Sequence, residues 1–350
     1  MNTFQSVGFG ILGLGVIAEF HVKAIKEISG ACFVGGFDTI PGKAAAFCEK
    51  HGGKPYEDLL HFLTDKDIDI VTIATPSGLH LDGSLAAVKA GKHIIVEKPL
   101  EITTARCDRI IAEAKANAVK VGTVFPSRYY ASSKIIKKAI EGGRFGKIVL
   151  ADAQTKWFRS QEYYDSGKWR GTWQLDGGGA LMNQSIHAID LLQWFMGDVT
   201  EVFAYTGTLV HERIEVEDCA AASLKFANGA LGVIEGTTGA YPGFLKKIEI
   251  YGSKGSAVME EENITTWQFA EEEAEDETIR SKYAAATSGA SDPKAIGHHG
   301  HRMLFESFVA ALMEDRPVDI DGNEGRKAVE IIEGIYRSAK TQAPVPLPLG

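Results

Sequence analysis

The stretch Val7–Ala18, which reads VGFGILGLGVIA, decides the fold of this 350-residue chain. Its first half, Val7–Leu12, is short and apolar, as expected of a buried strand, and glycines follow at positions 13 and 15. Beyond Gly15 the apolar residues recur at helical spacing. A strand, a tight glycine turn and a helix start with Gly-x-Gly-x-x-Ala together form the fingerprint of a dinucleotide-binding fold.

Glycine suits this turn because it lets the chain bend sharply and approach a pyrophosphate, whose charge then meets the free N–H groups of the helix start. The glycines at positions 8, 10 and 13 also fit Gly-x-Gly-x-x-Gly, but too few residues precede Gly8 to form the buried strand. An ordinary glycine turn is the alternative. The residues expected to bind the cofactor here are Gly13, Gly15, Val16, Ile17 and Ala18.

A second apolar run, Ala31–Phe37, ends in Asp38, twenty residues after Ala18. This is the position at which the fingerprint places an acid that binds the ribose hydroxyls. A carboxylate there repels a 2′-phosphate, so we expect NAD, with NADP as the alternative because Lys43 could soften the repulsion. Asp38 could also cap the helix that begins near Pro41.

Two further predicted strands, Asp69–Ala74 and His93–Val96, each end in a polar loop. Ligands of a parallel sheet lie beyond the carboxyl ends of its strands, so both loops should border the cofactor. Lys98 is the residue of most chemical interest, because a desolvated lysine can take part in proton transfer. A surface lysine is the alternative. The cofactor-binding residues expected in these loops are Thr75, Pro76, His80, Glu97 and Lys98.

Composition narrows the functional classes. The net charge of −9 argues against binding to nucleic acid or to an anionic membrane surface, and 45% hydrophobic with 24% charged residues is typical of a globular protein. The four cysteines are widely spaced and predict no disulfide framework or zinc ribbon. With no visible signal peptide and no long apolar run, we expect a cytoplasmic protein of two domains.

The second half of the chain changes to extended runs from Lys147 onward, with a hairpin turn at Asn228-Gly229. Many successive strands with short turns predict a large, mostly antiparallel open sheet, which needs a cover of helices or of a partner's sheet. Between the strands lies a predicted helix, 181–196, with one polar stripe along an apolar body. The stripe predicts a cleft, with a wet helix face as the alternative; it consists of Asn183, His187, Asp190 and Trp194.

Three motifs together are similar to those of the glucose–fructose oxidoreductase, inositol dehydrogenase and rhizopine catabolism (Gfo/Idh/MocA) family. They are GLGVIA at 13–18, ATPSGLH at 74–80 and EKP at 97–99. The resemblance implies an N-terminal NAD(P)-binding Rossmann domain at 1–125 and a substrate-binding and oligomerisation α+β domain at 126–350. It also implies that the open sheet mediates a homodimer or homotetramer, and that Lys98 contacts substrate and nicotinamide.

The same resemblance implies site residues in the second half. The family places an acid or amide four residues before a catalytic His or Tyr, here Asn183 and His187. Asn183 cannot relay a proton, so it would position substrate while His187 carries the acid–base role. The other residues expected to bind substrate are Arg128, Trp169, Arg170 and Asp190. The alternatives are a solvated arginine at 128 and tryptophans that belong to the core.

Two clusters of charged or titratable residues, one acidic and one of histidines, are not assigned a catalytic or metal-binding role. The acidic run Glu271–Glu277 is predicted to be a solvated loop, and 281–296 to be irregular. The histidines at 298, 299 and 301 lack the spacing of a metal site, so we expect no metal and a helix start near the substrate.

These residues predict an NAD-dependent dehydrogenase that oxidises a secondary alcohol of a sugar, cyclitol or nucleotide-sugar derivative. His187 would take the hydroxyl proton and Lys98 would stabilise the oxygen, although the sequence leaves open which of them is the formal base. Two rivals remain: an enzyme that returns the hydride for net glycoside cleavage or epimerisation, and a non-catalytic nucleotide-binding sensor.

Overall fold

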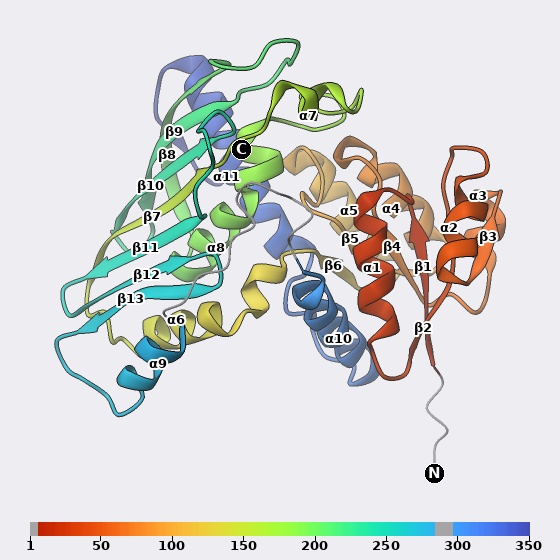
Figure 1. Ribbon diagram of the computed structural model, residues 1–350, viewed down its shortest axis with the longest axis horizontal. Helices are drawn as coiled ribbons and strands as arrows, with labels where there is room; N and C mark the ends of the chain where they lie inside the picture. Colours follow the sequence, from red (N-terminus) through yellow and green to blue (C-terminus); the bar gives the residue numbers. More distant parts are fainter. Residues whose placement is uncertain (1–5, 284–296) are drawn as a thin grey trace. The chain divides into compact units, whose positions relative to one another are not determined.

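The structure is a computed structural model that describes residues 6–283 and 297–350 (Figure 1). The chain divides into two compact units. The first comprises Met1–Pro126 and Gly297–Arg326, and the second comprises Ser127–Ile296 and Lys327–Gly350. The sequence-based division kept all of 126–350 in one domain, whereas here the segment Gly297–Arg326 packs with the N-terminal part of the chain.

The first unit is built on a six-stranded parallel sheet in the order β3-β2-β1-β4-β5-β6. This is the strand order of doubly wound dinucleotide-binding domains, so the predicted Rossmann fold is confirmed. Its strands are β1 (Val7–Leu12), β2 (Ala31–Phe37), β3 (Lys54–Tyr56), β4 (Ile70–Ile73), β5 (His93–Val96) and β6 (Val121–Thr123). Its helices are α1 (Val16–Lys26), α2 (Lys43–His51), α3 (Leu59–Thr64), α4 (His80–Lys89), α5 (Thr104–Ala116) and α10 (His299–Met313).

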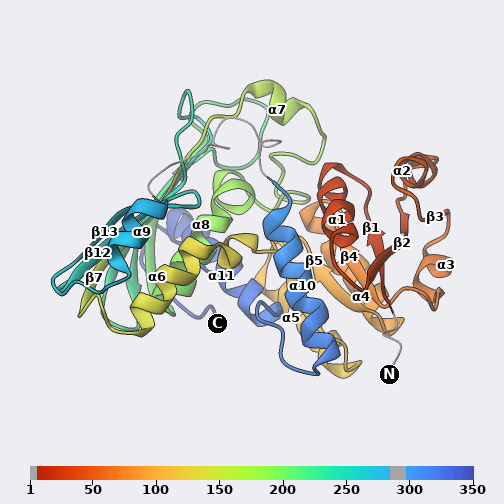
Figure 2. The same ribbon diagram turned by 60° about the horizontal axis from the view of Figure 1, so that its bottom comes forward.

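Helix α10 completes the core of this unit although it begins 176 residues beyond the end of β6 in the sequence. Every residue of β1 is buried, as expected for a parallel strand covered on both faces. The ring of Phe305 on α10 stacks on Phe9 of β1 with 5.9 Å between centroids. Figure 2 shows α10 alongside α1. The hydrophobic core of the first unit is therefore completed by a segment from late in the chain.

The second unit is built on an eight-stranded sheet in the order β13-β12-β11-β7-β10-β9-β8-β14. Among the described strands of this sheet only β7 and β10 pair in parallel, so the predicted, mostly antiparallel sheet is confirmed. Its strands are β7 (Ile148–Lys156), β8 (Val199–Gly207), β9 (Cys219–Phe226), β10 (Leu231–Thr237), β11 (Lys247–Gly252), β12 (Gly255–Glu260), β13 (Asn263–Phe269) and β14 (Val345–Pro346). Its helices are α6 (Ala131–Glu141), α7 (Gln161–Asp165), α8 (Ile186–Met196), α9 (Asp276–Tyr283) and α11 (Gly322–Thr341), whose first turns belong to the first unit.

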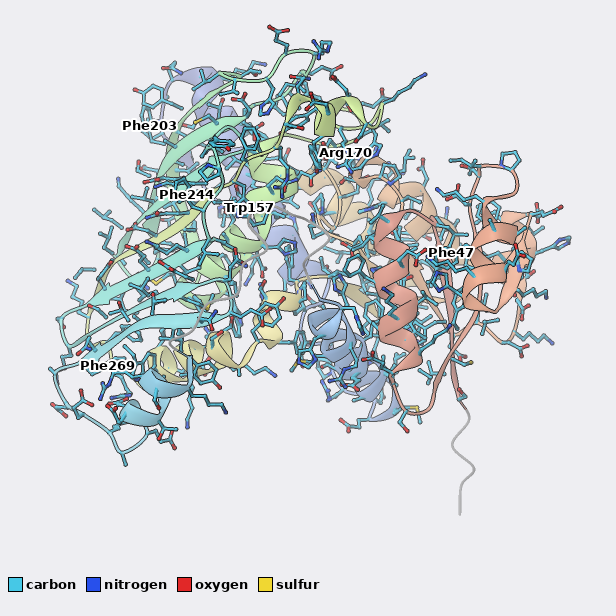
Figure 3. The ribbon with its side chains drawn as sticks, viewed as in Figure 1. Phe47, Trp157, Arg170, Phe203, Phe244 and Phe269 are labelled. Atoms are coloured by element: carbon cyan, nitrogen blue, oxygen red, sulfur yellow. The ribbon has the colours of Figure 1, made fainter. Side chains whose placement is uncertain are left out.

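Helices cover one face of this sheet and leave the other open. Along β9 buried and exposed residues alternate, and α8 packs against β7 and β11 on the buried side (Figure 1). The open side carries Phe203, labelled in Figure 3, together with Tyr205 and Leu231, which are 60% and 55% exposed. None of the described helices has the length and apolar character needed to cross a bilayer.

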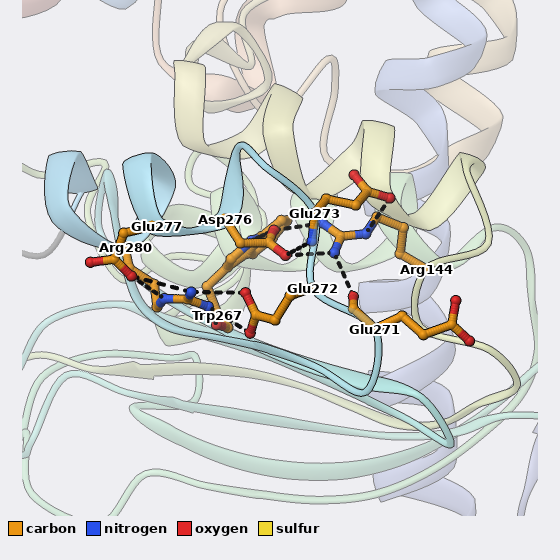
Figure 4. A network of polar contacts seen from close by, with 8 residues as sticks. All are labelled: Arg144, Trp267, Glu271, Glu272, Glu273, Asp276, Glu277 and Arg280. Atoms are coloured by element: carbon orange, nitrogen blue, oxygen red, sulfur yellow. Dashed lines mark hydrogen bonds and ion pairs between the residues drawn. The ribbon is translucent and has the colours of Figure 1, made fainter.

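The prediction of a solvated acidic loop at Glu271–Glu277 is wrong for one of its acids, Asp276. Asp276 is fully buried at the start of α9, where Arg144 donates to both of its carboxylate oxygens at 2.8 Å and Trp267 Nε1 donates at 2.7 Å (Figure 4). These donors hold the pKa of Asp276 far below its usual value, with Arg144 the largest cause. Sequence composition shows a charge run, but it does not show which acid turns inward.

Candidate active site

The glycine turn between β1 and α1 has the geometry that a pyrophosphate requires. Gly13 has φ +91°, and a Cβ there would lie 2.7 Å from the main-chain nitrogen of Thr75. Gly15 caps α1 without a side-chain hydrogen bond, and a Cβ on it would project into open space. Val16 behind it is 67% exposed, whereas Ala18 is fully buried. The helix start therefore has uncapped N–H groups beside free space, which fits a bound diphosphate.

Asp38 lies at the carboxyl end of β2, where a ribose would be expected. Its carboxylate accepts from the main-chain N–H of Leu14 at 2.8 Å and of Ile40 at 3.0 Å, and Lys43 Nζ lies 2.8 Å away. Burial raises the pKa of Asp38, but Lys43 and the two N–H donors outweigh it and leave the pKa below its ordinary value. Asp38 thus stays an anion, and Lys43 is its partner rather than a free cation.

The loop after β4 is tied to the loop after β5 through one buried imidazole. His80 places Nδ1 2.8 Å from the carbonyl oxygen of Pro99 and Nε2 2.9 Å from that of Thr75. Pro76 lies between Thr75 and the short 3₁₀ turn that leads into α4. Burial lowers the pKa of His80. Its ring is occupied by main-chain contacts, which fix the two loops relative to each other at the edge of the sheet.

Glu97 and Lys98 follow β5 directly. Glu97 is almost fully buried, and its carboxylate accepts from His21 Nε2 at 2.8 Å and from the main-chain N–H of Lys98 at 3.1 Å. His301 Nε2 lies 3.5 Å from the same oxygen that His21 contacts. The hydrogen bond from its main-chain N–H therefore fixes the backbone of Lys98 next to the buried carboxylate of Glu97.

In the second unit, a π-helical turn at Ala180–Ser185 precedes α8, where the sequence predicted one continuous helix. Between residues 180 and 196, the half-exposed side chains are those of Asn183, His187 and Trp194. The predicted stripe is thus present apart from Asp190, which is 1% exposed. Asn183 and His187 share a face that solvent or a ligand can reach.

Asp190 and Arg128 form a buried pair. Arg128 Nε donates to one carboxylate oxygen of Asp190 at 2.9 Å and Nη2 donates to the other at 2.6 Å. The side chains are 4% and 1% exposed. The sequence predicted both as substrate-binding residues, and the pairing means that each charge is already matched within the unit.

The start of the π-helical turn is anchored by a carboxyl group that the sequence analysis missed. Glu217 accepts from the main-chain N–H groups of Gly179 at 3.0 Å and Leu181 at 2.8 Å, and from the hydroxyl of Tyr336 at 3.0 Å. A Cβ on Gly179 would lie 1.7 Å from the carbonyl oxygen of Glu217, so only glycine permits this approach. Burial raises the pKa of Glu217 to about 7. Asn183 is held in the same turn by a 2.5 Å bond to Asp176.

A second missed residue, Arg159, lies beside the predicted substrate residues. The residue is 4% exposed, and its guanidinium donates to Gln184 Oε1 at 2.9 Å and lies over the rings of Trp157 and Tyr163. Arg170 contacts the same tyrosine. Its guanidinium lies 4.2 Å from the Tyr163 ring centre and donates to the Tyr163 hydroxyl at 2.7 Å. Figure 3 labels Trp157 and Arg170.

Trp169 and Trp173, which lie on either side of Arg170 in the sequence, differ in exposure. The ring of Trp169 packs on Arg170, whose guanidinium lies 4.4 Å from the ring centre. Trp173 is 46% exposed and meets the ring of Tyr336 edge-on, with 5.1 Å between centroids. Arg170 therefore lies between the rings of Tyr163 and Trp169, while Trp173 borders solvent.

Comparison with known proteins decides the family. Residues 7–125 match the model of the oxidoreductase family with an NAD-binding Rossmann fold, and residues 134–258 match that of the GFO/IDH/MocA C-terminal domain. The chain belongs to the Gfo/Idh/MocA family of oxidoreductases. The predicted NAD cofactor and oxidoreductase class are thereby confirmed.

Several characterised members of this family are similar over most of the chain. The myo-inositol 2-dehydrogenase of Thermotoga maritima is 31% identical over 271 residues, which cover 76% of this chain and 79% of that protein. The levoglucosan dehydrogenase of Pseudarthrobacter phenanthrenivorans is 28% identical over 323 residues, 83% of each chain. The crystal structure of the WlbA dehydrogenase from Bordetella pertussis, in complex with NADH and UDP-GlcNAcA, superposes with a TM-score of 0.90 at 35% identity and covers 99% of both chains.

Proposed function

We propose that this family member is an NAD-dependent dehydrogenase for a secondary alcohol on a sugar that carries an anionic group, such as a uronate or a nucleotide sugar. The proposal that the substrate carries an anionic group rests on the buried guanidinium of Arg159. Among the described residues, neither Arg159 nor Arg170 is paired with a carboxylate, and the Nε atom of Arg159 has no hydrogen-bond partner. Burying a cation without a counter-charge is unfavourable, so a bound anion would supply the missing partner.

The electrostatics around Arg159 support this reading. Burial lowers the pKa of Arg159, and the positive charge of Arg170 lowers it further. Two guanidinium groups that repel each other become mutually stabilised when a carboxylate or phosphate lies between them. Trp157, Tyr163 and Trp169 stack on these cations and keep their planar faces oriented. Of the similar proteins, WlbA was crystallised with UDP-GlcNAcA.

In the proposed reaction, NAD supplies the acceptor for the hydride that leaves the carbinol carbon. His187 takes the hydroxyl proton, and the ammonium of Lys98 donates a hydrogen bond to the same oxygen. Asn183 holds a neighbouring substrate hydroxyl, because its amide can both donate and accept but cannot relay a proton. The glycine turn and Asp38 bind the cofactor through its diphosphate and ribose.

The catalytic assignment is tested with Lys98→Met and His187→Asn. Each variant should lower kcat by about 10²–10⁴-fold, the range that a positioned acid or base contributes. Binding of NADH, measured by fluorescence titration, should remain in the His187→Asn variant. Undiminished turnover in either variant would remove that residue from the mechanism.

The substrate class is tested by following NADH formation across matched pairs of uronates and neutral sugars, with free and nucleotide-linked forms. Arg170→Gln should raise KM for the anionic members about tenfold or more and leave the neutral members unchanged. Lys168→Gln, an exposed cation two residues away, is the control. Equal turnover of neutral and anionic sugars would refute the anionic group. An absorbance scan that shows tightly bound NADH without net NADH formation would instead indicate internal hydride return, and absence of turnover on every sugar a sensor.

We also propose that the protein is cytoplasmic and forms a homodimer or homotetramer through the open face of the second unit's sheet. The exposed Tyr205 and Leu231 on that face support the interface, because an apolar open face favours a covering partner. Replacing both with glutamate should lower the mass measured by light scattering to that of one chain. An unchanged mass would place the interface elsewhere.

A further inference from the structure

Three side chains from distant parts of the sequence meet inside the first unit. His21 lies on α1, Glu97 follows β5, and His301 lies on α10. Their ligand atoms all lie within 4.8 Å of one another, and all three residues are buried. The ring of Phe305 packs edge-on against His21 at 5.1 Å, and Phe20 lies 6.1 Å from the ring of His301. Apolar rings therefore border both imidazoles.

The protonation of this group follows from its contacts. Burial alone raises the pKa of Glu97, but the bonds from His21 and His301 outweigh it and hold the pKa well below its ordinary value. Burial lowers the pKa of His21 more than the carboxylate raises it. Within residues 6–283 and 297–350, neither Nδ1 atom of the two histidines has a hydrogen-bond partner. Protonating Nδ1 of His21 would bury an N–H that has no acceptor among the described residues, so His21 is a neutral ring that presents Nε2–H to the Glu97 carboxylate.

The same contacts argue against a metal at this place. Two histidines and a glutamate are a known zinc donor set, but histidines that bind a metal donate their second N–H to a carbonyl or carboxylate. In the part of the chain that the structure describes, both Nδ1 atoms lack such an acceptor. In addition, His21 Nε2 is already 2.8 Å from the Glu97 oxygen, which is a direct hydrogen bond.

We propose that His21 and His301 are positioning residues for Lys98, because by occupying one oxygen of Glu97 they direct its other oxygen to the main-chain N–H of Lys98. The contacts divide accordingly. His21 lies 2.8 Å and His301 3.5 Å from Oε1, while Lys98 N–H donates to Oε2 at 3.1 Å. The carboxylate thus cannot turn without breaking bonds at both ends. The proposal rests on the proposed role of Lys98 in the reaction.

Through His301, helix α10 supports the position of Lys98 indirectly, by way of the Glu97 carboxylate. His301 is the only one of the three that comes from the segment Gly297–Arg326, so folding of this segment onto the Rossmann core completes the support of Lys98. Removing its Nε2–H leaves His21 to hold Oε1 and should loosen Glu97, so that the main chain of Lys98 shifts. A displacement of about 1 Å at a catalytic group can cost on the order of 100-fold in rate.

The test compares two variants at the same position. His301→Phe keeps an aromatic ring but removes the donor, whereas His301→Gln keeps an N–H that can reach the carboxylate. We expect kcat to fall about 10–100-fold in His301→Phe and to recover largely in His301→Gln, with the Kd for NADH unchanged in both. The control is His51→Phe, which removes another largely buried histidine of this unit, 2.8 Å from Glu19, far along the chain from Lys98.

The pH profile separates positioning from simple destabilisation. Glu97 is faced by His21 from α1, His301 from α10, His80 from α4 and its neighbour Lys98. Losing one donor raises the pKa of Glu97, so the acid limb of kcat should move to higher pH in His301→Phe. A lower melting temperature with unchanged kcat and unchanged acid limb would overturn the proposal. So would stoichiometric zinc in the purified protein that is lost in His301→Phe.

The outcome also distinguishes this proposal from the proposed function. If Lys98→Met abolishes turnover while His301→Phe leaves kcat intact, the positioning role fails alone. If Lys98→Met keeps full turnover, the catalytic assignment fails and the positioning role fails with it.

Discussion

Replacing Arg128 with methionine should destabilise the second unit rather than weaken substrate binding. Arg128 and Asp190 are 4% and 1% exposed and form two bonds of 2.9 and 2.6 Å, so the variant leaves a buried carboxylate without its cation. Breaking a buried ion pair from one side costs about 3–5 kcal/mol. For a unit of this size, that lowers the melting temperature by about 6–20 °C. Calorimetry on the wild type and Arg128→Met measures the shift.

Two further variants distinguish a structural role of Arg128 from a role in substrate binding. Arg128→Met combined with Asp190→Leu removes both charges and should recover most of the lost stability, because no uncompensated charge remains. Arg213→Met breaks an exposed pair with Asp165, where the side chains are 60% and 43% exposed, and should leave the melting temperature nearly unchanged because solvent screens the pair. If Arg128→Met melts like Arg213→Met but raises KM for the sugar tenfold, Arg128 faces substrate and the structural role is wrong.

Three further outcomes are expected. The pKa of Glu217 is raised by burial to about 7 from an ordinary 4.5, so its contribution to stability is full below pH 4.5 and is lost, by about 3 kcal/mol, as the pH rises through 7. The stability difference between wild type and Glu217→Gln in denaturant titrations should therefore shrink by that amount from pH 4.5 to pH 8; a constant difference contradicts the burial. Gly13→Ala should cost about 1–3 kcal/mol and abolish NADH binding, because φ is +91° and the Cβ meets the main chain of Thr75, whereas Gly15→Ala should weaken binding without lowering the melting temperature. Equal melting of the two alanine variants would refute this. Asp38→Ala should raise the Kd for NADH about tenfold and that for NADPH less, as judged by fluorescence titration; an equal loss for both cofactors would show that Asp38 only anchors Leu14.

The parts of the fold that local rules determine could be predicted from the sequence. The Gly13 turn needs a residue that accepts positive φ, and Asn228-Gly229 closes the hairpin between β9 and β10 for a similar reason. The apolar runs matched the parallel strands closely, with β1 and β2 beginning and ending at the expected residues. The short strand β3 was missed because Lys54–Tyr56 is exposed at its start and has no apolar run.

What the sequence could not show are the pairings between distant residues. Asp190 has the spacing of the polar stripe but turns inward because Arg128, 62 residues earlier, meets it. Arg159 lies on no motif, and only its burial beside Gln184 distinguishes it from other arginines. His301 stood in a histidine cluster, and its relation to Glu97 depends on where α10 packs. Such contacts are set by tertiary packing, which no single-sequence pattern records.

The late position of α10 has a consequence for biosynthesis. The ribosome completes β6 by residue 123, but the strand bearing Phe9 receives the ring of Phe305 only after that distant segment has been translated. At typical elongation rates of about 5–20 residues per second, the nascent Rossmann sheet waits on the order of 10–40 s with one flank uncovered. A chaperone that shields apolar surface should therefore associate with translation intermediates of this chain that end between β6 and α10.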